Sequence, residues 1–362
     1  MSSCAPFVPG FHIGIARVRF ESLHSLRMKV LINCSLPFAL AHGGWQIQIQ
    51  RTAAALEAIG LPVEFTRWWD DRQTADVIHY CGRMPAEHIK LAHQKGIKVV
   101  MAELLTAQGS RSPARLQLQK IISRTIESIA PRQFVSAFNW ESYRLADAVM
   151  VNTSWEGRIA HRLFGAAPEK IHVVPNGVEE VFLHSQPATR GPWLVCSATI
   201  TERKRILELA EASVRAQTPL WVLGKPYSES DSYAQQFKRL ADAQPQFIRY
   251  EGQVGDRSQL AQIYREARGF VLLSNMETRS LAAEEAAACE CPLLLSDLPW
   301  ARSVFGRSAS YCPVTSVAGT ARILRQFHDQ CPSLKPPPKP AAWQEVALQL
   351  KGIYEKVLST SR

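Results

Sequence analysis

Short apolar runs alternate with amphipathic segments along most of the chain. Turn-forming residues bound each run, and between the runs the apolar residues recur at the helical period. The clearest apolar runs are 28–33, 97–102, 146–151, 193–198, 219–223, 269–274 and 292–296. Strands that read as continuous apolar runs are typical of parallel sheets with helices on both faces. The pattern therefore predicts an α/β protein built on parallel sheets.

Breaks in this pattern divide the chain into parts. The 362 residues are enough for two domains of ordinary size. The polar stretch 185–192, which contains proline and glycine, predicts the linker between them. We therefore expect one Rossmann-like domain over 28–184 and a second over 193–340. Residues 341–362 predict a terminal helix that packs back on the first domain, and residues 1–27 are expected to be a disordered tail.

Composition and charge narrow the classes of partner. The chain is 46% hydrophobic and 20% charged, as in ordinary globular proteins, and its net charge is +10. A basic surface favours anionic partners such as nucleotide diphosphates or acidic lipid surfaces, although the same charge can simply keep a protein in solution. No nucleic-acid-binding motif is recognisable, so we expect no nucleic acid partner. No apolar stretch approaches the roughly 18 residues that a membrane span needs.

The eight cysteines are scattered, and several lie inside apolar runs. Isolated cysteines of this kind are typical of reduced thiols packed in a cytosolic protein. Cys289 and Cys291 are close in sequence, but no second pair or histidine stands at the spacing of a zinc site. The sequence therefore predicts a cytoplasmic protein without a metal site.

The stretch 268–305 carries the strongest sign of a binding site. It reads as a buried strand, a polar turn, an alanine-rich helix over about 280–289 and a second buried strand, which together form a βαβ unit. The turn after the first strand lies at the carboxyl edge of a parallel sheet, where the next helix points its free N–H groups at a ligand. Glu277 lies in that turn and Glu285 follows it by eight residues, so both carboxylates can face one crevice. Two solvated surface charges are the ordinary alternative.

A glycine pair follows the first predicted strand. Gly43 and Gly44 stand between that strand and a helical pattern that ends at Gly60. Because glycine lets a ligand approach the backbone, this turn can hold a phosphate at the helix N-terminus. A tight turn without a ligand gives the same pattern. The chain has no Gly-x-Gly-x-x-Gly or Walker sequence, which argues against a dinucleotide-dependent oxidoreductase and an ATPase.

Two motifs give the chain a family resemblance. The run from Glu277 to Glu285 reads Glu-Thr-Arg-Ser-Leu-Ala-Ala-Glu-Glu, and the run from Val174 to Val178 reads Val-Pro-Asn-Gly-Val. Both resemble signatures of the family-four retaining glycosyltransferases, and the resemblance extends over nearly all of 29–358. It implies the GT-B fold, in which two Rossmann-like domains face each other across a cleft. It also implies transfer of a sugar from a nucleotide diphosphate-sugar donor.

The resemblance implies roles for individual residues as well. Glu277 would bind the hydroxyls of the donor sugar and Glu285 the ribose of the nucleotide, and an ionised carboxylate is a strong acceptor for such hydroxyls. Gly43 and Gly44 would meet the donor diphosphate across the cleft. Lys204 matches the family lysine that neutralises the departing diphosphate.

Other donor contacts are implied where the chain departs from the family pattern. Thr199 stands where the family has an arginine close to this lysine. The candidates for the missing positive charge are Arg203, Arg205 and Arg279. The remaining donor contacts that the resemblance implies are Arg279, Ser280 and Leu281 after the first motif glutamate, and the backbone of Gln253 and Val254 near the nucleotide base.

Two residues at strand ends are candidates in the first domain. Many family members carry a functional histidine after the strand predicted at 97–102, and Glu103 occupies that place. The resemblance makes Glu103 a candidate catalytic residue together with Lys204 and Glu277. His79 ends another predicted strand, and a hydrogen-bonded structural histidine is the ordinary interpretation for it.

The segment 108–142 combines basic and apolar residues at helical spacing. Its basic residues are Arg111, Arg115, Lys120 and Arg124, and its apolar residues are Leu116, Leu118, Ile121, Ile122 and Ile126. A basic amphipathic helix can touch an anionic membrane surface or an acidic acceptor. The alternative is a helix whose apolar side packs on the core while its basic side is solvated.

The resemblance and these features together predict a metal-independent glycosyltransferase that needs no cofactor and retains the anomeric configuration. The donor would be a nucleotide diphosphate-sugar, and the acceptor a glycan, a glycolipid or a small molecule. We expect a cytoplasmic enzyme of polysaccharide or glycolipid biosynthesis, with peripheral contact at the inner face of the membrane as an open alternative. A non-catalytic nucleotide-sugar-binding homologue and an epimerase on the same fold are the rival interpretations.

Overall fold

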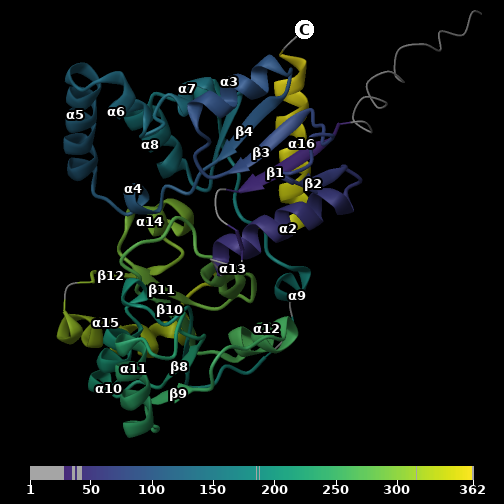
Figure 1. Cartoon of the computed structure of the whole chain (residues 1–362). Coiled ribbons are helices and arrows are strands. Elements are labelled where there is room, and N and C mark those ends of the chain that lie inside the picture. Colours follow the sequence, from purple (N-terminus) through teal and green to yellow (C-terminus); the bar gives the residue numbers. More distant parts are fainter. Residues whose placement is uncertain are drawn as a thin grey trace, which may run out of the picture.

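Two parallel β-sheets, one in each half of the molecule, organise the chain (Figure 1). The structure is a computed structural model that describes residues 28–34, 37–38, 43–184, 186, 188–314 and 316–360. Each sheet has six strands, and every strand is parallel to its neighbours. The predicted architecture of two Rossmann-like parallel sheets is therefore confirmed. The tail expected at 1–27 lies outside the described residues.

The central strands of the first sheet are buried on both faces, and the two edge strands are partly exposed. They are β1 (Val30–Cys34), β2 (Val63–Phe65), β3 (Val77–Cys81), β4 (Lys98–Ala102), β5 (Ala148–Val151) and β6 (Ile171–Val173), arranged in the order β2-β1-β3-β4-β5-β6. Val30, Ile32, Val77, Val99 and Val100 have no exposed surface. A strand covered on both faces needs apolar residues at successive positions, which explains why these segments read as continuous apolar runs.

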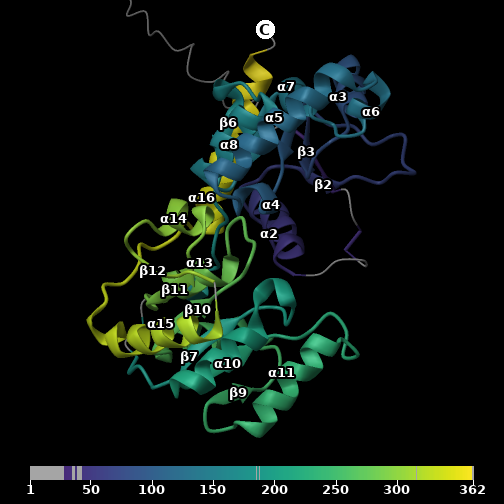
Figure 2. The ribbon, with the colours of Figure 1, turned by 90° about the vertical axis from the view of Figure 1, so that its left-hand side faces the viewer.

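Helices pack on the first sheet, and some of them lie farther from it on the surface. They are α2 (Gly44–Ala58), α3 (Ala86–Gln94), α4 (Thr106–Gly109), α5 (Pro113–Ile129), α6 (Arg132–Ser136), α7 (Ser142–Leu145), α8 (Ser154–Phe164) and the 3-10 turn η1 (Pro168–Lys170). Helix α8 is capped at its N-terminus by Thr153, whose hydroxyl accepts a hydrogen bond from the Glu156 N–H at 3.1 Å, and at its C-terminus by Gly165 in the left-handed conformation. Helix α5 lies on the outer side of this half (Figure 1, Figure 2).

The second sheet repeats the arrangement of the first. Its strands are β7 (Leu194–Ser197), β8 (Leu220–Leu223), β9 (Ile248–Tyr250), β10 (Gly269–Leu272), β11 (Leu293–Ser296) and β12 (Ser310–Cys312), arranged in the order β12-β11-β10-β7-β8-β9. Phe270, Val271 and Leu272 of β10 are fully buried, as are Leu294 and Leu295 of β11. These strands form the centre of a second apolar core that is separate from the cores of the first half.

The second half has its own set of helices. They are α9 (Glu180–Leu183), α10 (Ile206–Ala216), α11 (Ser232–Ala243), α12 (Arg257–Glu266), α13 (Leu281–Ala288), α14 (Pro299–Phe305), α15 (Val317–Gln330) and the 3-10 turns η2 (Glu202–Lys204) and η3 (Cys331–Ser333). Asp231 and Asp256 start α11 and α12, because each carboxylate accepts hydrogen bonds from N–H groups in the first turn. Trp300 and Phe305 anchor α14 in the second core.

The last helix, α16 (Trp343–Ser359), packs on the first sheet rather than the second (Figure 1). Its buried face includes Leu350 and Tyr354, and the Tyr354 hydroxyl lies 2.7 Å from Nδ1 of His79 on β3. The start of α16 lies close to the backbone at Gly177, because a Cβ atom on residue 177 would lie only 2.6 Å from Cα of Trp343. The glycine of the Val-Pro-Asn-Gly-Val motif is therefore needed for this packing as well as for its turn.

Candidate active site

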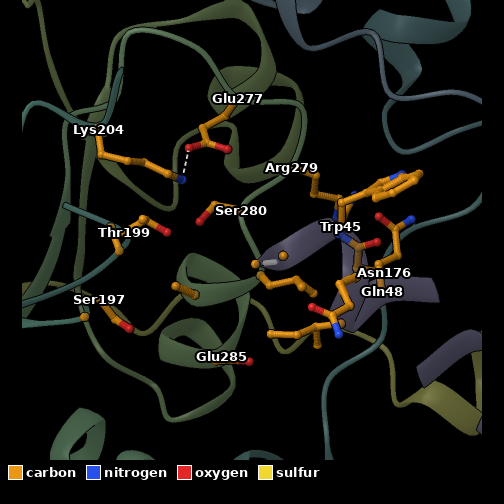
Figure 3. A pocket seen from close by; sticks show the side chains of 18 of the residues that line it. Trp45, Gln48, Asn176, Ser197, Thr199, Lys204, Glu277, Arg279, Ser280 and Glu285 are labelled. Carbon is orange, nitrogen blue, oxygen red and sulfur yellow. Dashed lines mark hydrogen bonds and ion pairs between the residues drawn. The ribbon is translucent and has the colours of Figure 1, made fainter. Parts of the chain in front are cut away.

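A cavity of about 710 Å³ lies between the two halves, at the carboxyl ends of strands from both sheets. The first sheet contributes the residues that follow β1, β4 and β6, and the second contributes those that follow β7, β8, β9 and β10. Figure 3 shows Glu277, Lys204 and Thr199 on one side of this cavity, with Trp45 and Asn176 on the other. The crevice at the carboxyl edge is the usual ligand site of open parallel sheets.

A carboxylate and two cations meet on the side of the second sheet. Glu277 follows β10 and its side chain forms an ion pair with Lys204 (Figure 3). Arg203 Nη1 lies 3.3 Å from the same oxygen, Oε1, and donates to the carbonyl of Met276 at 2.9 Å. Both cations come from η2, the turn that follows β7. The structure therefore brings a hydroxyl acceptor and two cations to one point of the cavity wall.

Glu285 is buried at another point of the same wall. It lies on α13 and forms an ion pair with Arg257, the first residue of α12. Burial raises the pKa of Glu285 to about 7, and the charge of Arg257 opposes that rise. Arg257 Nε also lies 2.9 Å from Glu179, whose other oxygen lies 3.1 Å from Arg51 on α2. A chain of alternating charges thus joins Glu285 to a helix of the first half.

Two further contacts connect the halves beside Glu277. The Ser110 hydroxyl accepts from the Glu277 N–H at 3.1 Å and donates to the Glu277 carbonyl at 3.2 Å. Arg279 donates to the carbonyl of Asn152 at 3.0 Å and to the buried carboxylate of Glu284 at 2.6 Å. These bonds hold the turn 277–280 against the first half, so the position of the turn depends on both sheets.

Two helices begin at the cavity. Gly43, with a φ of 121°, is the N-cap of α2 and has no side chain with which to cap the first turn. Ser280 starts α13, and its hydroxyl accepts from the N–H of Ala283 at 3.3 Å. Gly43, Gly44, Ser280 and Leu281 all line the cavity. The free N–H groups and positive dipole ends of both helices therefore face the space where an anion would bind.

Most of the donor contacts implied by the sequence lie together in this structure. The cavity wall contains Gly43, Gly44, Arg203, Lys204, Gln253, Val254, Glu277, Arg279, Ser280, Leu281 and Glu285. Thr199 is also in the wall, whereas Arg205 is not. Among the three arginines considered for the missing charge, Arg203 is the one that shares a partner with Lys204.

Glu103, the catalytic candidate of the first half, lies beside this set and not in it, and its catalytic role stays a prediction. Arg83 donates to both of its carboxylate oxygens, at 3.0 and 2.8 Å, and the Tyr143 hydroxyl donates to Oε2 as well. Glu103 lines a smaller neighbouring space and not the wall that Glu277 lines. Both oxygens of Glu103 are thus engaged, and these bonds link the end of β4 to α7. His79 is buried and bonded to Tyr354, as expected for a structural histidine, and burial lowers its pKa to about 4.

Several residues of the site were not anticipated from the sequence. Arg257 was not singled out in the sequence, and Ser110 was considered only as part of the segment 108–142. Asn176 belongs to the Val-Pro-Asn-Gly-Val motif but was not named as a site residue, and its side chain lines the cavity (Figure 3). Arg257 lies in the segment that follows β9, and such segments stand at the carboxyl edge of a parallel sheet, where sites form.

The wall offers binding groups for a phosphate ester of a sugar. Cations and helix N-termini can bind phosphate oxygens, and buried carboxylates can accept hydrogen bonds from hydroxyls. Among the described residues, no cluster of three or more histidine, cysteine, aspartate or glutamate side chains is arranged to hold a metal ion.

Family models match both halves of the chain. A model described as "Glycosyl transferase 4-like domain" matches residues 34–177, and one described as "Glycosyl transferases group 1" matches residues 191–330. D-inositol 3-phosphate glycosyltransferase of Jonesia denitrificans is 29% identical over 177 residues, which are 42% of this chain and 41% of that protein. The match thus spans less than half of the length of this curated relative.

Solved structures of similar fold cover nearly the whole chain. Sucrose-phosphate synthase from Thermosynechococcus elongatus has a TM-score of 0.62 at 17% identity, covering 92% of this chain and 100% of its own. The HepE protein of Anabaena, solved with UDP and glucose, has a TM-score of 0.59 at 13% identity and covers 92% of this chain and 99% of its own. At such identities the likeness concerns the fold, and it confirms the GT-B arrangement.

Proposed function

This chain belongs to the family-four glycosyltransferases of group 1, and we propose that it transfers a sugar from a nucleotide diphosphate-sugar to an acceptor hydroxyl with retention of configuration. The observation that carries the proposal is the meeting of Lys204, Arg203 and Glu277 beside the N-termini of α2 and α13. We take 28–184 as the acceptor-side domain and 193–340 as the donor-side domain. The chain would need no cofactor.

The positive groups match the charge that develops during transfer. When the bond between the anomeric carbon and the diphosphate oxygen breaks, its electron pair stays on that oxygen. Lys204 and Arg203 and the two helix ends would stabilise the growing negative charge, which is why we propose a mechanism independent of metal ions. Preorganised groups of this kind typically contribute several kcal/mol each to the stability of a transition state.

The carboxylates would orient the two sugar rings of the donor. Both cations contact Oε1 of Glu277, which leaves Oε2 for a hydroxyl of the transferred sugar. Glu285 would accept from the ribose hydroxyls, in place of part of its contact with Arg257. Because the protonated form of Glu285 is a weaker acceptor, donor affinity should increase as the pH rises through about 7.

The acceptor would complete the transfer from the first half of the cleft. Its oxygen bonds to the anomeric carbon on the face that the diphosphate leaves, and its proton passes to the departing diphosphate oxygen. The residues of the first half that border this space include Trp45, Gln48 and Asn176 (Figure 3). Contacts between the halves, such as Ser110 with Glu277, would exclude water from the reacting bond.

The compartment and acceptor class are parts of the same proposal. Six buried cysteines are free thiols, namely Cys81, Cys196, Cys289, Cys291, Cys312 and Cys331. Buried reduced thiols are typical of cytosolic proteins, so we place the enzyme in the cytoplasm. The acceptor would be a glycan, a glycolipid or a small molecule, and a peripheral membrane contact is argued below from α5.

A thermal-shift panel followed by a hydrolysis assay tests the proposal. UDP, GDP and ADP and their sugars are added to the full chain, with UDP-sugars first because Anabaena HepE was solved with UDP and glucose. We expect one base to raise the melting temperature and its sugar donor to be cleaved. Lys204→Ala should lower the rate of diphosphate release by on the order of 100-fold. Lys238→Ala is the matched control, since it breaks a surface pair with Glu229.

A non-catalytic nucleotide-sugar binder is the second candidate. The observation in its favour is Thr199, which lies in the cavity wall where the family has an arginine. A binder would be stabilised by a nucleotide-sugar without cleaving it, either alone or with acceptors. Stabilisation without cleavage would therefore replace the transferase proposal, and no stabilisation by any nucleotide would contradict both.

A further inference from the structure

Helix α5 exposes the apolar residues that most helices bury. None of its 17 residues is buried. Leu118 is 58% exposed, Ile121 55%, Ile122 50% and Ile129 78%. A helix on the surface of a globular protein normally turns its apolar side to the core and its polar side to water. An exposed cluster of large aliphatic side chains is therefore a sign of an interaction surface.

The exposed residues form one continuous stripe along the helix. Positions 114, 118, 121 and 125 follow one another at intervals of three or four, as do 118, 122, 125 and 129, so the six positions share a face. At 1.5 Å per residue, the helix that carries this stripe is about 25 Å long. On the other side of the helix, Leu116 is half-buried and packs on the core of the first half, and Ile126 is half-buried at the edge of the stripe. We call the residues Leu118, Ile121, Ile122 and Ile129 the α5 stripe.

Positive charge borders the α5 stripe. Arg115 and Arg124 are exposed and Lys120 is half-buried, while Glu127 is the one acidic residue of the helix. Exposed aromatic rings extend the apolar surface beyond the helix, at Phe134 of α6 and at Phe138 in the turn that follows. Aliphatic and aromatic side chains between arginines fit the boundary between the head groups and acyl chains of an anionic bilayer.

We propose that α5 is a membrane-docking helix, which lies along the surface of an anionic phospholipid bilayer with the α5 stripe in the acyl boundary and Arg115 and Arg124 at the head groups. No helix within the described part of the chain is long and apolar enough to cross a membrane. A second copy of the chain is a poorer occupant, because pairing two α5 helices would bring like charges together.

The start of α5 lies close to the turn that carries Glu277. Ser110, which bonds the backbone of Glu277, precedes Pro113 by three residues. Three extended residues span at most about 11 Å. A bilayer that receives α5 would thus lie beside the cleft, and an acceptor hydroxyl carried by a lipid could reach the sugar site. Docking itself does not depend on the proposed transfer reaction.

Co-sedimentation with vesicles tests the docking helix. The full chain is incubated with phosphatidylcholine vesicles and with vesicles that also contain phosphatidylglycerol. We expect binding to the anionic vesicles, and a loss of affinity on the order of 100-fold when Leu118, Ile121, Ile122 and Ile129 are all changed to Ser. The paired change Arg115→Gln and Arg124→Gln should weaken binding at low salt and have less effect at about 0.5 M salt, where charges are screened.

Matched controls separate the helix from exposed apolar residues in general. Leu91 on α3 and Leu348 on α16 are each 54% exposed. The double variant Leu91→Ser and Leu348→Ser should bind vesicles as the wild type does. Circular dichroism and the nucleotide thermal shift check that each variant is folded with an intact cleft. If donor cleavage fails while stripe-dependent vesicle binding holds, the transferase proposal is wrong and the docking proposal stands.

Three results would overturn the docking proposal. The first is a wild-type chain that binds neither kind of vesicle. The second is a stripe variant that binds anionic vesicles as tightly as the wild type. The third is a wild-type dimer, measured by sedimentation velocity, that becomes monomeric when the α5 stripe is changed, because the stripe would then be an interface between copies of the chain.

Discussion

Helices α13 and α5 both place side chains in the environment that suits them least: α13 buries carboxylates, and α5 exposes aliphatic groups to water. Helix α13 buries the carboxylates of Glu284 and Glu285, whereas α5 leaves the side chains of Ile122 and Ile129 in water. A buried charge costs free energy unless it is paired, and an exposed aliphatic side chain forgoes the gain from burial. The pairs with Arg279 and Arg257 offset the first cost. Among the described residues of the chain, no helix or strand covers the α5 stripe.

Helix α16 shows the ordinary arrangement against which these two differ. It has 17 residues, as α5 does, and it buries Val346, Leu350, Ile353 and Val357 in the first core. The pattern of apolar residues along α5 and α16 is similar, yet within the described residues α16 buries its apolar face and α5 leaves most of its apolar side chains exposed. Residues placed against their solvation preference thus coincide, in this chain, with the two surfaces that we propose for ligands.

The largest expected effect comes from removing the buried charge that faces the cleft. Glu285→Ala should lower the rate of sugar transfer by about 100- to 1000-fold, because the ribose loses its charged acceptor and Arg257 is left in the donor space. The chain should stay folded, which circular dichroism can verify. Glu229→Ala removes a carboxylate of a surface pair and should leave transfer unchanged. Equal rates for the two variants would contradict a functional role for the α13 carboxylate.

Alanine substitutions in α16 and α5 should have different effects on the free energy of unfolding, because α16 buries its apolar side chains and α5 exposes them. Leu350→Ala creates a cavity in the first core and should lower the free energy of unfolding by about 2 to 5 kcal/mol. Ile122→Ala in α5 should change it by less than about 0.5 kcal/mol. Urea unfolding of both variants measures the difference. A large loss for Ile122→Ala would mean that α5 packs on the protein in solution, against the proposal of a free docking face.

A smaller effect is expected in the dependence of stability on pH. Burial raises the pKa of Glu285 to about 7 from its ordinary value of 4.5. Between pH 4.5 and 7 the folded state therefore binds more protons than the unfolded state. The contribution of Glu285 to the free energy of unfolding is fully present below pH 4.5 and is lost as the pH rises through 7. Against Glu285→Gln, the wild type should lose about 1 to 3 kcal/mol of its free energy of unfolding across this window.

Urea unfolding of both proteins at several pH values measures this loss. Glu156, whose pKa is also raised to about 7 by burial, is present in both proteins and cancels in the difference. A difference between the two proteins that does not change with pH would contradict the buried, raised state of Glu285.

Much of the fold could be predicted because parallel strands have a simple signature. Val30, Ile32, Val99 and Val100 are buried on both faces of the sheet, so they appear in the sequence as continuous apolar runs. The grouping of Glu277 and Lys204 could be anticipated for a related reason. Each follows a strand, and the carboxyl ends of neighbouring parallel strands meet at one edge.

Contacts between distant segments could not be predicted from such local patterns. Glu103 follows a strand as Glu277 does, but Arg83 and Tyr143, which engage both its oxygens, stand 20 and 40 residues away along the chain. Arg257 is identified as a site residue by its ion pairs with Glu285 and Glu179, which the sequence alone does not reveal. For α5, helical spacing predicts an apolar face without indicating what covers that face.

The most direct test of the central claim is a crystal structure of the full chain with the nucleoside diphosphate that stabilises it. We predict the diphosphate between Lys204 and the N-termini of α2 and α13, with the ribose hydroxyls on Glu285. A nucleotide bound outside the cavity that Glu277 and Lys204 line would contradict the account.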